Sequence, residues 1–250
     1  MTVDNQSKNN NKEPWKPRDK RFVAVLDIMG FKELVAKNSH LEVYEILSKI
    51  NNEIQHQQDH FDLLYITTFS DSIFIFTKDD TFQSFQRFII AATIISSTIL
   101  DGIPMNGAIA FGDITVNKQK NIFFGQPIID AHLLQESLFY YGVVFHNSVD
   151  LRIYKEGKEL LSINNFKNYF IEVNTPFKDG NIICNNLNWI ELLTGNVPYE
   201  RQKERLNDIL ISLRQNVSGR PRKYIDNTSV VFNEWFSFCE EVERRFHSAD

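Results

Sequence analysis

The chain has 250 residues, of which 42% are hydrophobic, 13% aromatic and 24% charged. This composition is typical of a globular protein, and it excludes intrinsic disorder, collagen and low-complexity scaffolds. The formal net charge of -5 argues against a nucleic-acid binder, because such proteins need a positive field.

Cysteine and glycine usage narrows the class of protein further. Cys184 and Cys239 stand far apart, without a Cys or His partner at ligand spacing, which argues against a disulfide framework and a structural zinc site. The ten glycines form no Walker-type or dinucleotide-binding motif. The sequence shows neither a secretory signal nor a membrane-spanning stretch, so we expect a cytoplasmic protein without membrane contact.

The first part of the chain predicts a tail, a strand and two helices. Residues 1–20 are rich in Asn, Lys, Asp and Pro, and we expect a disordered tail there, with folding from Arg21. Phe22–Asp27 is an apolar run that ends in a carboxylate, which predicts a strand buried on both faces. A helical stretch follows Gly30, and apolar residues at helical spacing predict a helix over Leu41–Gln58.

The next segments predict a hairpin, a helix and a strand. Leu63–Thr68 and Ser72–Thr77 are β-branched and aromatic runs separated by a short turn, with Asp71 at the tip. A long apolar helix is expected over Thr81–Leu100, before a turn containing Gly and Pro. A further strand is expected over Met105–Thr115.

The last core elements are a helix over Pro127–Tyr140 and a short strand over Gly142–Phe145. The order predicts an α+β, ferredoxin-like βαββαβ core over 21–149, with an antiparallel central sheet and helices on one face. We expect residues 150–250 to form a mainly helical C-terminal extension packed on this core.

Two carboxylates stand out against this topology. In a βαββαβ sheet the first strand neighbours the hairpin, so Asp27 and Asp71 are expected at the same sheet end. Paired carboxylates suit hard divalent cations and the phosphates that these cations bind. The alternative interpretation is purely structural, because an Asp before a helix is often an N-cap and an Asp in a turn is often a turn residue.

Four segments in this order resemble the class III nucleotidyl cyclase catalytic domains. They are Phe22–Phe31, Thr68–Ser72, Gly107–Gly112 and Gly125–Ala131. The resemblance implies that Asp27, Asp71 and the Ile28 carbonyl bind two Mg²⁺ or Mn²⁺ ions per active site. It also implies that backbone amides of Met29, Gly30 and Phe31 hold the phosphates of a nucleoside triphosphate, and that a homodimer has its active sites at the interface.

The sequence departs from the family where purine bases are selected. The positions that carry a Lys or Glu and an Asp or Cys in purine cyclases are Thr67 and Ile122 here. By strand alternation Tyr65 lies on the same face as Thr67, and a bulky Tyr would narrow a base pocket towards a pyrimidine. An ordinary aromatic sheet residue is the alternative for Tyr65.

A second departure concerns charge stabilisation. The family's transition-state Asn and Arg, expected four and eight residues after Gly125, are replaced by Ile129 and Leu133. Either the domain is inactive or another cation acts on the reacting phosphate, because such stabilisation is usually a large term. The candidate cations are Arg87, Lys118, Lys120 and Arg152. His132, on the same predicted helix, is interpreted as a partly buried structural residue.

These departures, together with Asp27–Lys32 and Lys223–Thr228, resemble most the Pycsar-type pyrimidine cyclases of bacteria. That resemblance implies conversion of UTP, ahead of CTP, to the 3′,5′-cyclic monophosphate, an antiphage second messenger made in the bacterial cytoplasm. An inactive nucleotide-binding or dimerisation module and a purine (adenylate) cyclase remain alternatives. A polymerase-palm relative is disfavoured, because Phe69–Ser72 lacks the Gly-Gly-rich acidic hairpin.

Overall fold

The structure is a computed structural model that describes residues 14–59, 62–161, 169–189, 199–215 and 217–247. One sheet contains the eight strands β1 Arg18–Ile28, β2 Leu64–Phe69, β3 Ser72–Thr77, β4 Met105–Asn117, β5 Ile122–Phe124, β6 Val143–Phe145, β7 Phe170–Phe177 and β8 Gly180–Leu187. The helices are α1 Phe31–Lys37, α2 His40–Asp59, α3 Phe82–Ser96, the 3₁₀ helix η1 Ser97–Asp101, α4 Gln126–Ser137, α5 Asn147–Leu161, α7 Tyr199–Gln215 and α8 Arg220–His247.

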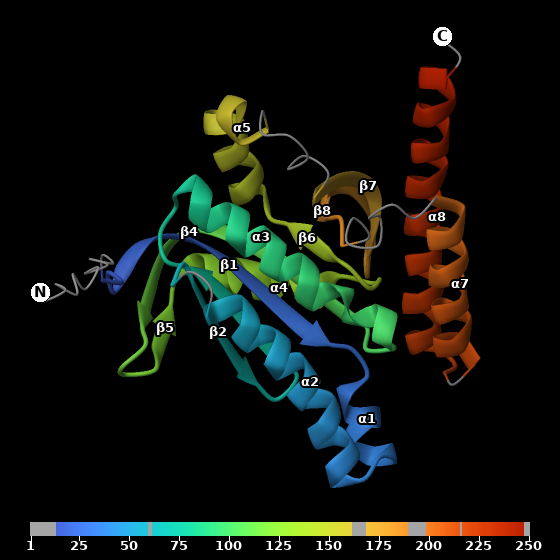
Figure 1. Cartoon of the computed structure of the whole chain (residues 1–250), viewed down its shortest axis with the longest axis horizontal. Helices are drawn as coiled ribbons and strands as arrows, with labels where there is room; N and C mark the ends of the chain where they lie inside the picture. Colours follow the sequence, from blue (N-terminus) through green and yellow to red (C-terminus); the bar gives the residue numbers. More distant parts are fainter. Residues whose placement is uncertain (1–13, 60–61, 162–168, 190–198, 216, 248–250) are drawn as a thin grey trace, which may run out of the picture.

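The sheet has the strand order β2-β3-β1-β4-β6-β8-β7, and β5 pairs with β4 (Figure 1). The β4–β6 pair is parallel and the other pairs are antiparallel. The order β4-β1-β3-β2 in the first half is that of a βαββαβ unit. The α+β class and the mostly antiparallel ferredoxin-like sheet are therefore confirmed.

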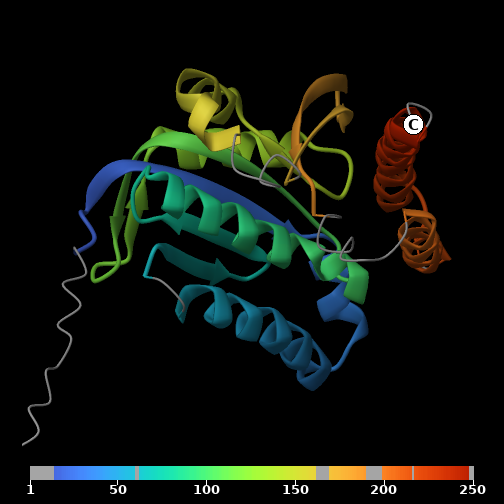
Figure 2. The same ribbon diagram turned by 45° about the horizontal axis from the view of Figure 1, so that its top comes forward.

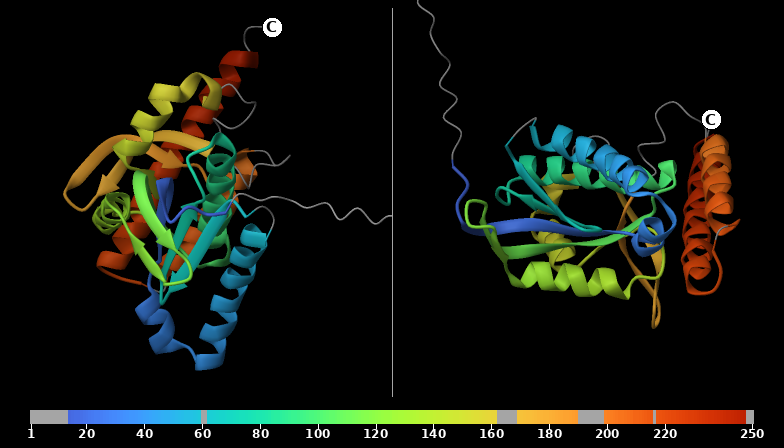
Figure 3. Two further views of the ribbon diagram at one scale, coloured as in Figure 1. Left: turned by 90° about the vertical axis from the view of Figure 1, so that its left-hand side faces the viewer. Right: turned by 90° about the horizontal axis from the view of Figure 1, so that it is seen from below.

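Helices cover both faces of the sheet, which corrects the expectation of one covered face. Side chains of β1 alternate between two apolar clusters, with Phe22 and Leu26 facing α2 and α3, and Val23 and Val25 facing α4. The sheet separates α4 from α2 and α3 (Figure 3). A strand that is apolar at every position needs a cover on each face, so the continuous run in β1 already required this second layer.

The fold begins earlier in the chain than expected. β1 starts at Arg18, and Trp15 is already packed, because its Nε1 lies 3.3 Å from both the carbonyl oxygen and the Oδ1 of Asp62. The ammonium of Lys118 lies 3.6 Å from the centre of the Trp15 ring. The part of the expected tail from Trp15 onwards is thus structured, whereas residues 1–13 lie outside the described residues.

Glycine permits a very close strand contact near the end of β1. Gly107 on β4 pairs with Leu26, and a Cβ on Gly107 would lie 2.7 Å from the Val25 carbonyl oxygen and would also overlap the Leu26 side chain. Because Gly107 has no side chain, the backbone of β4 can approach the backbone of β1 closely at Val25 and Leu26. This packing fixes the position of Asp27, which pairs with the preceding residue of β4, Asn106.

The C-terminal segments continue the same architecture. The β7–β8 hairpin joins the sheet through the pairing of Val144 with Asn186. Helices α7 and α8 lie side by side at one end of the sheet (Figures 1 and 2). They bury a third apolar cluster that includes Tyr141, Leu210 and Trp235. Within the described residues, no helix has the length and apolarity that crossing a membrane requires.

Helix α4 is shorter than expected and ends at Ser137. Residues 138–141 leave the helix because their backbone groups bind elsewhere. The Phe139 amide donates to the Pro176 carbonyl at 3.0 Å, an ordinary length for a backbone hydrogen bond. The Tyr141 amide donates to the hydroxyl of Thr228 on α8 at 2.8 Å. The segment after α4 is thus held between β7 and α8.

Candidate active site

The structure places Asp27 and Asp71 at the same end of the sheet. Asp27 is the penultimate residue of β1 and pairs with Ser72, the residue that follows Asp71. Ser70 adopts a left-handed conformation (φ 57°) in the hairpin turn, and the Ile28 amide donates to the Asp71 carbonyl at 2.9 Å. The two acidic residues therefore come together through neighbouring strands and one tight turn.

The two carboxylates interact electrostatically. Burial, followed by repulsion from Asp71, raises the pKa of Asp27 from 3.8 to about 6. The Ser72 hydroxyl donates to Asp27 Oδ1 at 3.3 Å, and this bond together with the charge of His132 opposes the rise in pKa. A cation between the carboxylates would remove the repulsion.

The donor set fits a divalent cation of the Mg²⁺ or Mn²⁺ type. Such ions take oxygen ligands and often bind through one or two carboxylates together with waters and substrate phosphates. In the part of the chain that the structure describes, no group of three or more His, Cys, Asp or Glu side chains could hold a metal. The pair Asp27 and Asp71 therefore suits a metal that is shared with a phosphate ligand rather than a closed protein cage.

Only some of the backbone amides in the turn after β1 are available to a ligand. Gly30 has φ 76°, and a Cβ placed on it would meet nothing within 4 Å. The Met29 amide already donates to the Pro104 carbonyl at 2.8 Å. The expectation that Met29 offers its amide to a phosphate is therefore wrong, and only the amides of Gly30 and Phe31 remain of the three expected.

Of the expected base-pocket residues, Tyr65 lies on the α4 side of the sheet. Tyr65 packs into the apolar cluster that α4 covers, with its ring centre 5.5 Å from that of Phe123 on β5. Lys118 Nζ lies 5.0 Å from the Tyr65 ring centre. Thr67 lies two residues nearer to the hairpin tip, and Ile122 on β5 is exposed.

Strand register separates Tyr65 from Asp27 within one chain. Tyr65 pairs with Phe76, which pairs in turn with Val23 on β1. Val23 precedes Asp27 by four residues, which is about 13 Å along a strand. Within one chain, Tyr65 therefore lies two strands away from Asp27 and about four residues further along the sheet.

The four candidate cations are not gathered around Asp27. Arg152 lies 3.4 Å from Asp80, beyond the end of β3 that is opposite to Asp71. Lys118 and Lys120 lie in the β4–β5 turn, at the end of β4 that pairs with the start of β1. Arg87 is on α3, which covers the face opposite to α4.

Two residues that the sequence did not mark as part of the site interact with Asp27. The charge of His132 on α4 lowers the pKa of Asp27, so the imidazole lies within electrostatic range of the site. Burial raises the pKa of Tyr224 on α8, and the charges of Arg220 and Asp27 act on it in opposite directions. Tyr224 lies in the Lys223–Thr228 segment, but its proximity to Asp27 could not be read from that segment, because it depends on the packing of α8 against residues 138–141.

The residues at the family's transition-state positions face solvent. Ile129 and Leu133 are 52% and 57% exposed, one helical turn apart on α4. Phe124, shortly before α4, is 61% exposed. Because residues four apart on a helix are neighbours, Ile129 and Leu133 form one exposed apolar strip on α4.

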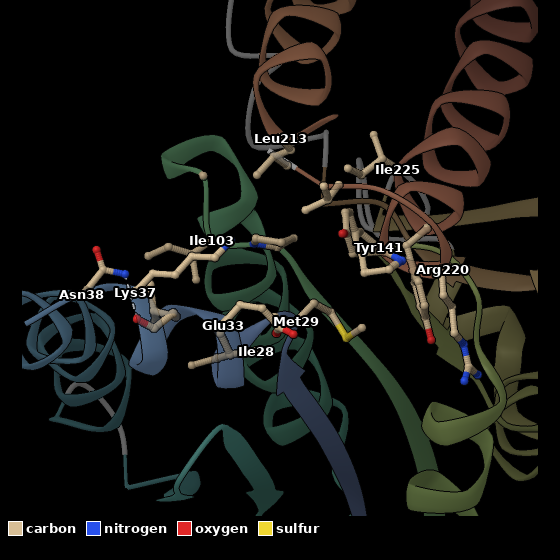
Figure 4. A pocket seen from close by; sticks show the side chains of 17 residues that line it. Ile28, Met29, Glu33, Lys37, Asn38, Ile103, Tyr141, Leu213, Arg220 and Ile225 are labelled. Carbon is tan, nitrogen blue, oxygen red and sulfur yellow. Dashed lines mark hydrogen bonds between the residues drawn. The ribbon is translucent and has the colours of Figure 1, made fainter. Parts of the chain in front are cut away.

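A cavity of about 490 Å³ opens beside the Gly30 turn (Figure 4). Met29 and Gly30 line it from the end of β1, and Tyr141, Arg220 and Tyr224 line it from the opposite side. Figure 4 shows Met29 on one side of the opening and Tyr141 and Arg220 on the other. This volume is in the range of small-molecule sites in proteins.

Comparison with solved structures identifies the fold. A non-canonical dimeric guanylyl cyclase domain of the RhoGC fusion protein from the aquatic fungus Blastocladiella emersonii matches with a TM-score of 0.51 and 15% identity, over 69% of this chain and 98% of that one. The catalytic core of a rhodopsin-guanylyl cyclase with converted specificity, solved with ATPalphaS, matches with a TM-score of 0.50 and 15% identity, over 69% of this chain and 97% of that one. No protein-family model and no curated protein matches the sequence.

The fold is therefore that of nucleotidyl cyclase catalytic domains. Both matched domains are covered almost completely, which places the similarity over the whole of their architecture. At 15% identity the likeness concerns the fold alone, and the chemistry has to be argued from the residues of this chain.

Proposed function

We propose that this protein is a nucleotidyl cyclase that converts UTP, ahead of CTP, to the 3′,5′-cyclic monophosphate and pyrophosphate. The observation that supports this most is the meeting of Asp27 and Asp71 at one sheet end of a cyclase fold. A repelling carboxylate pair raises the free energy of the metal-free protein, so a role in cation binding accounts for it better than a structural role does.

In the proposed reaction the ribose 3′-oxygen attacks the α-phosphorus, loses its proton, and displaces pyrophosphate. Asp27, Asp71 and the Ile28 carbonyl hold two Mg²⁺ or Mn²⁺ ions. When bound, these ions lower the pKa of the attacking hydroxyl and neutralise the phosphates. Ser72 orients the Asp27 carboxylate, and the amides of Gly30 and Phe31 bind the outer phosphates.

We propose a homodimer with its active sites at the interface. The separation of Tyr65 from Asp27 along the strands supports a base pocket, with Thr67 and Ile122, that serves the site of the other protomer. The exposed Ile129 and Leu133 suit burial in such an interface. Absence of the purine-selecting residues at the positions of Thr67 and Ile122 supports a pyrimidine substrate.

The biological role that we propose is synthesis of a second messenger for antiphage defence in the bacterial cytoplasm. It rests on the resemblance of residues 27–32 and 223–228 to the Pycsar-type cyclases. A gene for a cyclic-nucleotide-binding membrane effector next to the gene for this protein would support it.

A non-catalytic nucleotide-binding module is the second candidate. It is favoured by one observation, which is that apolar Ile129 and Leu133 occupy the positions of the polar transition-state pair. Retention of both Asp27 and Asp71 disfavours it, since a module without metal chemistry gains nothing from their repulsion.

The test is incubation of the purified protein with each of the four ribonucleoside triphosphates and Mn²⁺, followed by chromatography of the products. We expect cyclic UMP as the main product and no cyclic product from Asp71→Asn. A cyclic purine product would overturn the pyrimidine assignment. Binding of UTP without any cyclic product, by a folded protein, would favour the non-catalytic module.

A further inference from the structure

The N-terminal end of α8 forms a wall of the cavity that adjoins the Gly30 turn. Arg220, the first residue of α8, lines this cavity together with Met29 and Gly30. Figure 4 shows Arg220 and Tyr141 on the side of the opening opposite to Met29 and Ile28. The C-terminal part of the chain thus contributes a cation to the cavity that Gly30 also lines.

The position of this wall is fixed by hydrogen bonds to residues 138–141. The Tyr224 hydroxyl donates to the Leu138 carbonyl at 3.1 Å, and Asn227 Nδ2 donates to the Phe139 carbonyl at 2.7 Å. The Thr228 hydroxyl accepts from the Tyr141 amide at 2.8 Å. Three bonds along one helical stretch hold the start of α8 in one orientation, as a ligand-binding group requires.

The charge of Arg220 is available for an anion. Its guanidinium carbon lies 5.8 Å from the centre of the Phe139 ring, a contact that positions a cation without neutralising it. Among the described residues, no ion pair includes Arg220. Arg220 and Asp27 both influence the pKa of Tyr224, which is raised mainly by burial, so Arg220 and the carboxylate site both lie within electrostatic range of this one phenol.

The proposed reaction leaves a need for such a cation. Asp27 and Asp71 use part of the charge of the bound metal ions, so a triphosphate at this site keeps a net negative charge. The residues at the family's two polar positions, Ile129 and Leu133, supply no compensating charge. A guanidinium binds phosphate oxygens through two parallel hydrogen bonds, which an ammonium cannot do.

We propose that Arg220 is a phosphate-binding residue, which holds the outer phosphates of the nucleotide from the α8 side of the cavity while the Gly30 turn lies on the other side. This inference rests on the proposed function, since it names the group that binds the triphosphate at the same site. It assigns a role in substrate binding to the segment after residue 150.

The experiment compares three variants of the full chain, which are Arg220→Gln, Arg220→Lys and the matched control Arg222→Gln. Arg222 is also an exposed arginine in the first turn of α8, but it does not line the cavity. Binding of inorganic triphosphate and of UTP is measured by calorimetry with Mn²⁺, beside thermal unfolding of each variant. We expect Arg220→Gln to weaken both ligands by roughly tenfold or more, Arg220→Lys to retain part of the affinity, and Arg222→Gln to bind as the wild type.

The outcomes separate this inference from the proposed function. If Arg220→Gln binds inorganic triphosphate as tightly as the wild type, or if Arg222→Gln loses as much affinity, the role of Arg220 is refuted. If the wild type binds UTP through Arg220 but yields no cyclic product, the cyclase proposal fails and the binding role stands. If Arg220→Gln is unfolded, Arg220→Lys decides, because an affinity equal to that of the wild type would contradict recognition through a bidentate guanidinium.

Discussion

Replacing Asp27 with Asn is expected to stabilise the metal-free protein at neutral pH. The pKa of Asp27 is raised from 3.8 to about 6, first by burial and then by Asp71, so ionised Asp27 opposes folding. By linkage this rise corresponds to about 3 kcal/mol in the free energy of unfolding. Because the carboxyl is partly exposed, solvent screening reduces the expected gain for Asp27→Asn to about 1–2 kcal/mol.

The sign of the pH dependence follows from the direction of the rise in pKa. Below 3.8 Asp27 is protonated in both states and the penalty is absent, whereas it develops as the pH rises and is complete above about 6. Urea unfolding with EDTA should therefore show a clear difference between wild type and Asp27→Asn at pH 7.5 and a much smaller one at pH 4.5. Asp179→Asn, in the exposed β7–β8 turn, is the control and should show neither effect. Equal stability of wild type and Asp27→Asn at pH 7.5 would refute the argument.

Three further changes test other parts of the structure. Gly107→Ala should destabilise the fold by about 1–3 kcal/mol in urea unfolding, since its Cβ would lie 2.7 Å from the Val25 carbonyl oxygen; an unchanged midpoint would contradict this packing. Thr228→Val should lower the free energy of unfolding by about 1–3 kcal/mol, because the buried Tyr141 amide loses its acceptor, and a neutral effect would argue against that bond. Leu133→Asp should shift the protein from dimer to monomer in analytical ultracentrifugation, and an intact dimer would place the interface elsewhere.

The first half of the fold can be predicted from the sequence because its signals are local. The apolar run of β1 and the two runs around Asp71 define three strands and the tight turn between two of them. The strand neighbours of a βαββαβ unit then place Asp27 beside that turn. The sequence predicts α4 as a helix but does not indicate which face of the sheet it covers. Its apolar pattern is ambiguous, because Ile129 and Leu133 are apolar and yet exposed.

The parts of the site that the sequence did not indicate depend on contacts between distant segments. Lys223–Thr228 carries a family resemblance, but that segment does not indicate where Tyr224 or Arg220 lies, and both are positioned by the packing of α8 on residues 138–141. The Met29 amide was expected to be available, but its bond to Pro104 is set by the turn after η1. Trp15 lies in a polar stretch whose composition is typical of a tail, and only contacts with distant residues give it a place in the fold.

The attachment of α8 to residues 138–141 limits how this protein can be shortened. Cutting the chain before α8 would leave the Tyr141 amide and the carbonyls of Leu138 and Phe139 without their partners. Water would reach these groups once α8 is gone, so the main cost is exposure of the apolar cluster that α8 covers, which includes Tyr141 and Trp189, at about 25 cal/mol per Å² of apolar surface. A fragment trimmed to a βαββαβ core alone should therefore be less stable than the full chain and expose an apolar surface.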